Sequence, residues 1–309
     1  MAVYEVYNHP EVRRYRTNVC SRATYVQLIT TLLTFLPPLF IGYGSQGFWQ
    51  KSDTYQEQPD VHFKHQVLMV LETAQESSYI AWSTYQNFNR MQQAHLRVPI
   101  VKSREEDSNR DGLYDTLYLT VQVPLLDTEH IHGVKLLLIF DYKLNILSSF
   151  QMESMAYIQH DSPRSGAELK VIGDLRLVQK DLLLHRGVDN RFNSPVIDDT
   201  SIYADAYDLA NIFSSYSSRN VTTVLDSSYP VWTTGRGTGQ PFVITATIRY
   251  PRETLFYIPG FWQLIKWAWV QYVAILIIFV AAFDRIKTFI FQNQLVPTIV
   301  DRPFKLNRS

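Results

Sequence analysis

The sequence has almost no cysteine. Cys20 is the single cysteine among 309 residues, which excludes an intramolecular disulfide. Small secreted domains usually need disulfides, because they cannot bury enough apolar surface to fold without them. A folded domain outside the cytosol must therefore be large enough here to be stabilised by its own hydrophobic core.

The sequence also lacks net charge, since 29 basic residues balance 29 acidic residues. Proteins that bind nucleic acid usually carry a basic excess, so a nucleic-acid partner is not expected. The charges are nevertheless distributed unevenly. Residues 1–22 carry a net charge of +2 and residues 284–309 carry +3, whereas residues 51–260 carry −6.

Enzyme motifs are missing as well. The sequence contains neither Gly-x-Ser-x-Gly nor His-Glu-x-x-His. His130 and His132 have no evident third metal ligand, and the glycine-rich residues 235–239 lack the strand–turn–helix context of a nucleotide loop. We expect a protein that is not an enzyme, with no small-molecule substrate and no required cofactor.

Two long segments are almost free of charge. Residues 23–50 contain no charged residue, and residues 261–283 contain only Lys266, close enough to one end to reach the headgroups. About 20 apolar residues span a hydrocarbon core of roughly 30 Å. A cleaved signal peptide is the alternative for the first segment, but its apolar stretch is too long and Pro37-Pro38 falls inside it. We expect two transmembrane helices.

Positive charge predicts the orientation of these helices. Four arginines precede the first segment and two basic residues follow the second: Arg13, Arg14, Arg16 and Arg22, then Arg285 and Lys287. Such clusters favour the cytosolic side. The sequence predicts a multi-pass membrane protein with a cytosolic tail (1–22), a first transmembrane helix (23–46), a β-rich extracellular domain (47–260), a second transmembrane helix (261–283) and a second cytosolic tail (284–309).

Two covalent modifications agree with this orientation. Asn220-Val221-Thr222 is a glycosylation sequon in the extracellular part, which predicts N-glycosylation at Asn220. Cys20 lies on the cytosolic side next to the membrane and is a candidate for S-palmitoylation, with an unmodified thiol as the alternative.

Aromatic residues recur at the outer ends of both helices. Gly-Phe-Trp-Gln occurs at residues 47–50 and again at residues 260–263. Amphipathic aromatic rings favour the headgroup zone, so we expect the two pairs at the outer membrane interface, unless the recurrence is chance. The pairs are Phe48 with Trp49, and Phe261 with Trp262.

The first helix has a polar face formed by Thr24, Gln27, Thr31 and Thr34. Polar groups in hydrocarbon need partners, and Gln271 of the second helix is one candidate. Helix packing is the interpretation we favour. A pore lining is the alternative, although no ring of carboxylates accompanies these residues.

The region between the helices has the pattern of a β domain. Apolar and polar residues alternate along 116–123 and 242–250, and residues 66–72, 95–101, 134–142 and 168–178 are further predicted strands, some buried on both faces. Only residues 206–216 have helical spacing. The pattern predicts a mainly-β protein, with an antiparallel β-sandwich ectodomain flanked by two transmembrane α-helices.

An acidic loop precedes the strand at 116–123. Oxygen-bearing residues at alternate positions around a glycine turn can bind a hard cation such as Ca²⁺. The twelfth position of the loop is tyrosine rather than glutamate, and the alternative is a solvated hairpin with Asp111-Gly112 as its turn. The candidate Ca²⁺ ligands are the side chains of Asp107, Asn109, Asp111 and Asp115 and the carbonyl of Leu113.

Short motifs spread over nearly the whole chain match one known family in a single register. They are Tyr4-Glu5, His9-Pro10, Pro37-Pro38, Gly47-Phe48-Trp49, Glu57-Gln58-Pro59, Ala81-Trp82-Ser83-Thr84, Arg104-Glu105-Glu106-Asp107, Gly173-Asp174-Leu175-Arg176-Leu177, Arg219-Asn220-Val221-Thr222-Thr223-Val224-Leu225 and Trp269-Val270-Gln271-Tyr272-Val273. Through these residues the chain resembles the transmembrane protein 231 family, and the resemblance weakens only in the last dozen residues.

The resemblance implies a structural component of the ciliary transition-zone membrane, within the Meckel/tectonic-like complex. That family contributes to the diffusion barrier that controls ciliary membrane composition, and so supports ciliogenesis and Hedgehog signalling. The implied partners are tectonic proteins, coiled-coil and C2-like subunits, and other membrane proteins of the complex, besides membrane lipid. A two-span channel subunit is the alternative function, although such channels usually brace their ectodomains with many disulfides.

Overall fold

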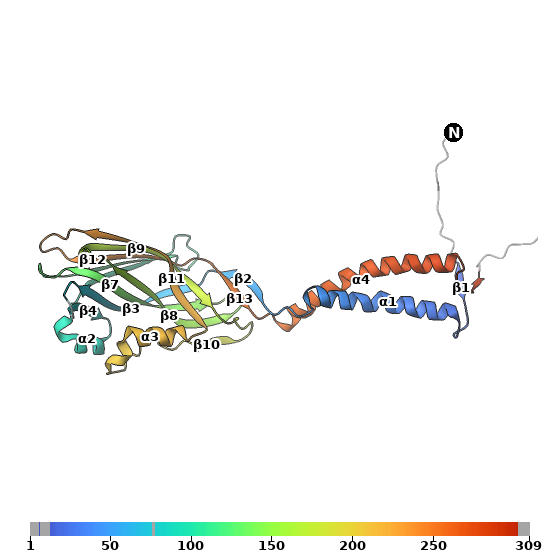
Figure 1. Ribbon diagram of the computed structural model, residues 1–309, viewed down its shortest axis with the longest axis horizontal. Coiled ribbons are helices and arrows are strands. Elements are labelled where there is room, and N and C mark those ends of the chain that lie inside the picture. The colour runs from blue at the N-terminus through green and yellow to red at the C-terminus, as the bar shows by residue number, and fades with distance from the viewer. Residues whose placement is uncertain (1–5, 7–12, 76–77, 302–309) are drawn as a thin grey trace, which may run out of the picture. The chain divides into compact units, whose positions relative to one another are not determined.

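The computed structural model describes residue 6 and residues 13–75 and 78–301 (Figure 1). They form two compact units, each described here by itself. One is a helical unit, made of the described residues up to Lys51 and from Gly260 on, and the other is a β-rich domain from Ser52 to Pro259. The outermost parts of the two predicted cytosolic tails lie outside the described residues.

The helical unit contains the two apolar helices that the sequence predicts. They are α1 (Arg22–Gln46) and α4 (Phe261–Gln292), and both are long and apolar enough to cross a membrane. Helix α1 begins where the hydroxyl of Ser21 accepts the amide of Thr24 at 3.4 Å, and it ends at Gly47, whose φ of 70° favours glycine. Helix α4 continues past residue 283, the predicted end of the second span.

A short ladder joins the segments outside the two helices. Strand β1 (Arg14–Arg16) pairs antiparallel with β14 (Ile299–Asp301). Arg16 also forms an ion pair with Asp301 at 3.2 Å. The chain therefore returns, after α4, to the segment that precedes α1.

The β-rich domain consists of two five-stranded sheets and one two-stranded ladder. The first sheet has the order β10-β8-β7-β3-β4, the second has the order β11-β9-β12-β6-β5, and the ladder is β13-β2. The strands are β2 (Asp53–Glu57), β3 (Asp60–Thr73), β4 (Tyr79–Ser83), β5 (Ile100–Glu106), β6 (Thr116–Val123), β7 (Ile131–Leu144), β8 (Ser149–Asp161), β9 (Gly166–Gln179), β10 (Val188–Phe192), β11 (Val221–Thr234), β12 (Phe242–Arg249) and β13 (Glu253–Tyr257).

Most neighbouring strands are antiparallel, which confirms the predicted mainly-β sandwich. Two ladders differ, because β10 pairs with β8 and β12 pairs with β9 in parallel. Parallel pairs need long connections between the strands, and here other strands of the domain supply them. The sheets are therefore mixed rather than wholly antiparallel.

The main core lies between the two sheets. Alternate residues of each strand point into it, as on Phe242, Ile244, Ala246 and Ile248 of β12, which are all fully buried. The period-two pattern of the sequence predicts this face correctly. The strand predicted at 95–101 is only partly correct, because residues 93–95 form a 3₁₀ turn and β5 begins at Ile100.

A second core covers the outer face of the first sheet. Leu68 of β3 and Leu137 and Ile139 of β7 point away from the main core, toward α2 (Gln86–Gln92), η2 (Ala204–Tyr207) and α3 (Leu209–Ser217). Figure 1 shows α2 and α3 on this side of the domain. The helix predicted at 206–216 is confirmed, whereas α2 was not predicted.

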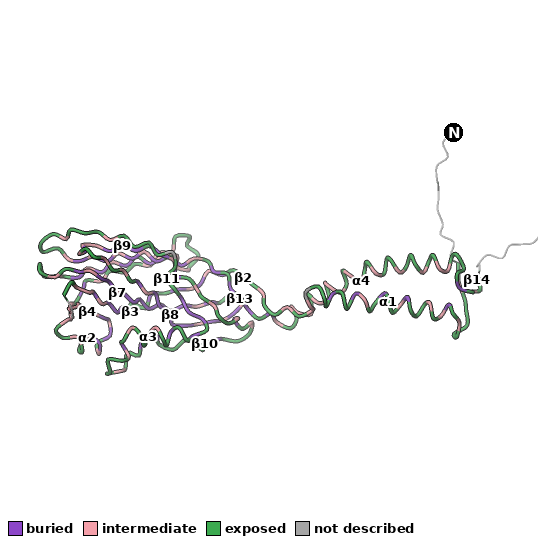
Figure 2. Tube along the Cα trace, in the orientation of Figure 1, coloured by how far each residue is buried: buried purple, intermediate pink, exposed green. Residues whose placement is uncertain are grey.

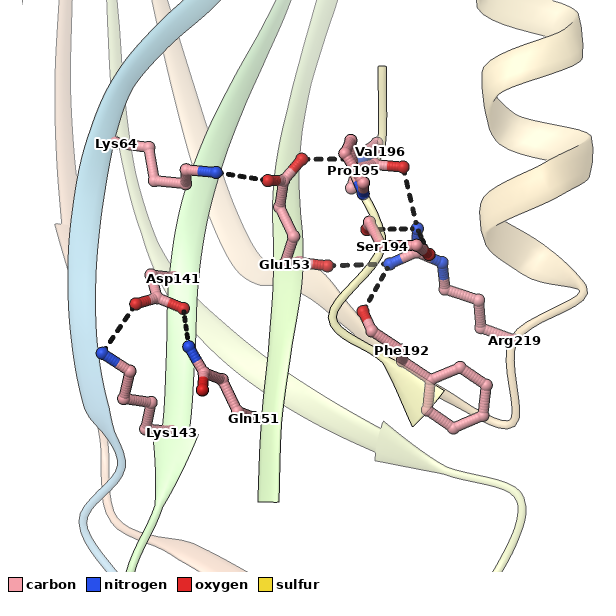
Figure 3. A network of polar contacts seen from close by, with 10 residues as sticks. All are labelled: Lys64, Asp141, Lys143, Gln151, Glu153, Phe192, Ser194, Pro195, Val196 and Arg219. Atoms are coloured by element: carbon pink, nitrogen blue, oxygen red, sulfur yellow. Dashed lines mark hydrogen bonds and ion pairs between the residues drawn. The ribbon is translucent and has the colours of Figure 1, made fainter. Parts of the chain in front are cut away.

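A buried polar network attaches the segment after β10, which contains Val196 and Ile197, to β8 (Figure 3). The carboxylate of Glu153, which is 5% exposed, accepts the amide of Val196 at 2.6 Å and forms an ion pair with Lys64. Val196 and Ile197 are themselves buried in the second core. A charged side chain of the sheet thus holds an apolar segment in place.

Arg219 completes this network from the end of α3. Its guanidinium donates to the backbone carbonyls of Glu153 (2.9 Å), Phe192 (3.2 Å), Ser194 (3.0 Å) and Pro195 (3.2 Å). Burial lowers the pKa of Arg219, because it penalises the charged form. Hydrogen bonds to four carbonyls offset the loss of hydration.

We expect Arg219→Ala to lower the free energy of unfolding of the β-rich domain by about 3 kcal/mol, because it leaves buried carbonyls without donors. Arg219→Lys should recover only part of this loss, since an ammonium lacks the planar fork. Urea unfolding followed by tryptophan fluorescence measures the effect. The matched control is Arg104→Ala on β5, an exposed ion-pair partner that should cost less than about 1 kcal/mol. Equal losses for the two alanine variants would contradict the role of Arg219.

Candidate functional site

Helix α1 buries a stripe of small residues. Thr30, Thr34, Pro38 and Gly42 follow one another at intervals of four and are all buried within the helical unit. Residues spaced by four share one face of a helix, and small side chains let two membrane helices approach closely. This stripe is the face through which α1 packs.

Gly42 accommodates an aromatic ring as well as the partner helix. A Cβ atom at Gly42 would lie 2.9 Å from the ring of Phe48 and 3.6 Å from Cδ1 of Ile275 on α4. The absent side chain therefore leaves room for Phe48 to fold back against α1. A carbonyl near the prolines is also satisfied from α4, because the hydroxyl of Tyr272 donates to Phe35 O at 3.4 Å.

The predicted polar face of α1 is only partly the buried one. Thr34 lies on the stripe, but its neighbour there is Thr30, which the sequence pattern missed. The hydroxyl of Thr30 donates to Val26 O at 2.9 Å and that of Thr34 to Thr30 O at 2.7 Å. These hydroxyls bond their own helix rather than Gln271, whose Oε1 is buried without a partner among the described residues.

The predicted interface aromatics project from the helical unit. Trp49, Phe261 and Trp262 are exposed, whereas Phe48 is partly buried. The rings of Phe261 and Trp262 lie 5.6 Å apart in an edge arrangement. Their position at a membrane interface stays a prediction.

The outer face of the second sheet carries an exposed apolar patch. Tyr229 of β11 lies opposite Ile172 of β9, and Val231 lies opposite Lys170. Tyr229, Val231 and Ile172 are 65%, 57% and 48% exposed. We call Ile172, Tyr229 and Val231 the open-face patch. Buried and less buried residues alternate along β9, whereas most of β7 in the first sheet is buried (Figure 2).

Two buried carboxylates face each other on the β2–β13 ladder. Glu57 lies opposite Glu253, and both are buried. Glu57 accepts the amides of Asn145 and Ile146, and Glu253 accepts the amide of Leu177. Among the described residues neither forms an ion pair. Burial raises the pKa of the Glu253 carboxyl, because it penalises the charged form.

The acidic loop is closed by its own side chains. The carboxylate of Asp107 accepts the amides of Arg110 (2.6 Å) and Gly112 (2.9 Å). Asp111 N–H donates to Asn109 and Leu113 N–H donates to Asp111, each at 2.9 Å. Residues 110 and 112 have φ values of 60° and 90°, which suit the tight turn.

Asp115 anchors this loop to the rest of the domain. Its carboxylate accepts Gln58 Nε2 and the amide of Ser108, each at 2.8 Å. The slight burial of Asp115 opposes ionisation, but these hydrogen bonds prevail and hold its pKa below the usual range. Within the described ranges, no three His, Cys, Asp or Glu side chains form a metal-binding group. Carboxylate oxygens can accept more than one bond each, so Ca²⁺ binding here stays a prediction.

The two predicted modification sites lie at accessible positions. Asn220 is exposed at the start of β11, where its side-chain amide donates to Asp181. Cys20 is a free, exposed cysteine just before α1. Glycosylation of Asn220 and palmitoylation of Cys20 stay predictions.

Comparison with known proteins covers both units. The profile of the family described as "Transmembrane protein 231" matches residues 1–300. The chain belongs to the transmembrane protein 231 family. It is 52% identical to transmembrane protein 231 of Mus musculus over 300 residues, covering 97% of this chain and 95% of the relative.

Two further members of the family give the same picture. The identity is 50% to the Xenopus tropicalis protein, covering 97% of this chain and 96% of the relative, and 50% to the Homo sapiens protein, covering 97% and 95%. The matched region includes α1, the β-rich domain and α4. Family membership and the two apolar helices together make this chain a transmembrane protein of the 231 family.

We expect the β-rich domain to lose stability as pH rises through the folded-state pKa of Glu253. A raised pKa means that the fold favours the protonated carboxyl, so this stabilisation is complete below the unfolded-state pKa and is lost above the folded-state value. Glu253→Gln should flatten the dependence, since it retains the acceptor for Leu177 and removes the charge. Urea unfolding between pH 4 and about 8 measures how the free energy of unfolding depends on pH. Glu106→Gln on β5 is the control. Parallel curves for wild type and Glu253→Gln would refute the assignment.

The Ca²⁺ prediction is tested by thermal unfolding with and without added Ca²⁺. Binding to the folded loop should raise the melting temperature, because a ligand of the native state stabilises it. The double variant Asp107→Ala with Asp111→Ala should not respond. A wild-type domain as insensitive to Ca²⁺ as this variant would show that the loop is a solvated hairpin.

Proposed function

We propose that this protein is a structural, non-enzymatic membrane component of the ciliary transition-zone (tectonic-like) complex. In this proposal it contributes to the diffusion barrier that controls ciliary membrane composition, and thereby supports ciliogenesis and Hedgehog signalling. The observation that carries the proposal is the match to the transmembrane protein 231 family over residues 1–300, because it covers both apolar helices and the β-rich domain.

The geometry supports a scaffold in two ways. Two membrane helices that pack through a stripe of small residues provide a stable anchor, and hydroxyls bonded to their own helix do not provide a polar pore lining. The β-rich domain has one sheet buried on both faces and one with an exposed outer face. A rigid, large domain held at the membrane obstructs diffusing membrane proteins without any chemistry.

The proposed partners are tectonic proteins and other membrane, coiled-coil and C2-like subunits of the complex. We assign contact with a protein subunit to the open-face patch, since exposed apolar patches rimmed by polar residues mark such interfaces. The charged rim includes Lys170 paired with Glu168 at 3.4 Å and Arg249 paired with Asp174 at 2.6 Å. The proposed location is the transition-zone membrane, with both termini in the cytosol.

The proposal is tested in ciliated cells that lack the protein. Membrane proteins normally excluded from the cilium should enter it, and wild-type protein should restore their exclusion. A knockout with unchanged ciliary membrane composition would contradict the barrier function.

A patch variant separates the surface from the anchor. Tyr229→Ser with Val231→Ser should reach the membrane but fail to restore exclusion and should co-purify less with other subunits. The control is Ile146→Ser, which removes an equally exposed apolar side chain from the β7–β8 loop. Full rescue by the patch variant would show that subunits bind elsewhere.

A further inference from the structure

A polar hollow of about 660 Å³ lies in the helical unit, at the end where α1 begins and α4 ends. The residues that line it include the cations Arg13 and Lys287 and the polar residues Gln27, Gln292 and Tyr15. No acidic residue among the described ones lines it. The hollow therefore presents positive charge and hydrogen-bond donors, the combination that binds phosphate.

The walls of the hollow come from three separate elements. Tyr15 belongs to β1, where it pairs with Val300 of β14, and its ring lies 5.9 Å from that of Phe291 on α4. Gln27 belongs to α1, whereas Lys287 and Gln292 belong to α4. The ion pair between Arg16 and Asp301 fastens the β1–β14 ladder. The segment before α1 therefore contacts α4 and the segment that follows α4 directly.

The lengths of the two helices favour a position of the hollow near the lipid headgroups. Gln27 is five residues from the start of α1, which corresponds to about 8 Å along the helix axis. Helix α4 has 32 residues and is about 48 Å long, so it exceeds a hydrocarbon core of roughly 30 Å. Its charged last turns, with Lys287, therefore extend into the headgroup zone.

We propose that this hollow binds the phosphate of an anionic phospholipid headgroup. Phosphate oxygens would accept from Lys287 and Arg13 and from the side-chain amides beside them. A free phosphate compound offers the same chemistry. The lipid is favoured because Leu28 on α1 and Phe289 on α4 are exposed apolar side chains close in sequence to the lining residues, where acyl chains can cover them.

The test is a titration of the full-length protein in an uncharged detergent, followed by native mass spectrometry. Dioleoyl phosphatidic acid is the anionic probe, dioleoyl phosphatidylcholine is the zwitterionic control, and glycerol 3-phosphate is the soluble headgroup without acyl chains. We expect phosphatidic acid to bind more tightly than either control. Lys287→Gln should weaken its binding about five-fold, the effect of one cation near a lipid phosphate.

A matched control lies on the same helix. Arg285→Gln removes the same charge two residues away, from a side chain that does not line the hollow, and should change binding less than two-fold, as roughly expected for screened charge. Each variant is first compared with wild type by its melting temperature without lipid. Arg13→Gln combined with Lys287→Gln should weaken binding further than either alone.

Three results would overturn the proposal. Equal losses for Lys287→Gln and Arg285→Gln would show diffuse attraction rather than a site. Equal binding of phosphatidylcholine would exclude recognition of an anionic headgroup. Glycerol 3-phosphate binding as tightly as phosphatidic acid would assign the hollow to a free phosphate compound instead of a lipid.

Discussion

The β2–β13 ladder is the constraint on which the architecture depends. Strand β2 is the first strand of the β-rich domain and β13 is the last, and Asp53 lies opposite Tyr257 in their register. The chain therefore enters and leaves the domain at adjacent points. Only then can the helices on either side, α1 and α4, pack against each other. The ladder joins segments about 200 residues apart in the sequence into one closed domain.

This ladder also contains a local conflict. Glu57 and Glu253 place two carboxylates opposite each other in the register at a buried position, where burial penalises the charged form of Glu253. Three backbone amides from two other segments satisfy part of their hydrogen-bonding capacity. Protonation of Glu253 removes the cost of burying its charge, so the stability of the domain is coupled to pH at this point. A hydrophobic pair would avoid the conflict but could not bind the amides of Asn145, Ile146 and Leu177.

The two sheets differ in what covers their outer faces. The covered sheet contributes a second core to stability, whereas the uncovered sheet offers a surface for a partner. The first sheet is buried on both faces, because α2, α3 and the segment held by Glu153 and Arg219 lie over it. The second sheet is buried on one face only, and the open-face patch lies on the other. A partner that covers this patch would complete a four-layer arrangement without disturbing either core.

Much of the fold could be predicted from local pattern, because burial on one face dictates a period. The alternation along 116–123 and 242–249 identified β6 and β12, and the two apolar segments with almost no charge identified both helices. Other features have no local signal. The parallel pairing of β9 with β12 depends on contacts between residues about 75 apart, and α2 has only Phe88 buried, too little for a helical period.

The candidate sites also divide into those with a local sequence signal and those without one. The acidic loop was visible because its oxygen-bearing residues fall at alternate positions of one short segment, and the glycosylation sequon is a local motif by definition. The roles of Arg219 and Glu253 were invisible, since an isolated charge in a sequence does not reveal burial. On α1, Thr24, Gln27 and Thr31 share a face with Thr34 on a helical wheel. The stripe through Thr30, Pro38 and Gly42 is set by where α4 packs, which no single-helix pattern contains.

Helix α4 is longer than the hydrocarbon core of a membrane is thick. A helix of 32 residues cannot be confined to the hydrocarbon core, so its last turns carry Asp284, Arg285 and Lys287 beyond it as regular helix. Helical geometry fixes the direction of these side chains: Arg285 and Lys287 are two residues apart and point about 200° apart around the axis. One of them can line a hollow shared with β1 while the other faces elsewhere. The folded extension therefore gives part of a cluster of positive charge the fixed direction that the proposed headgroup site requires.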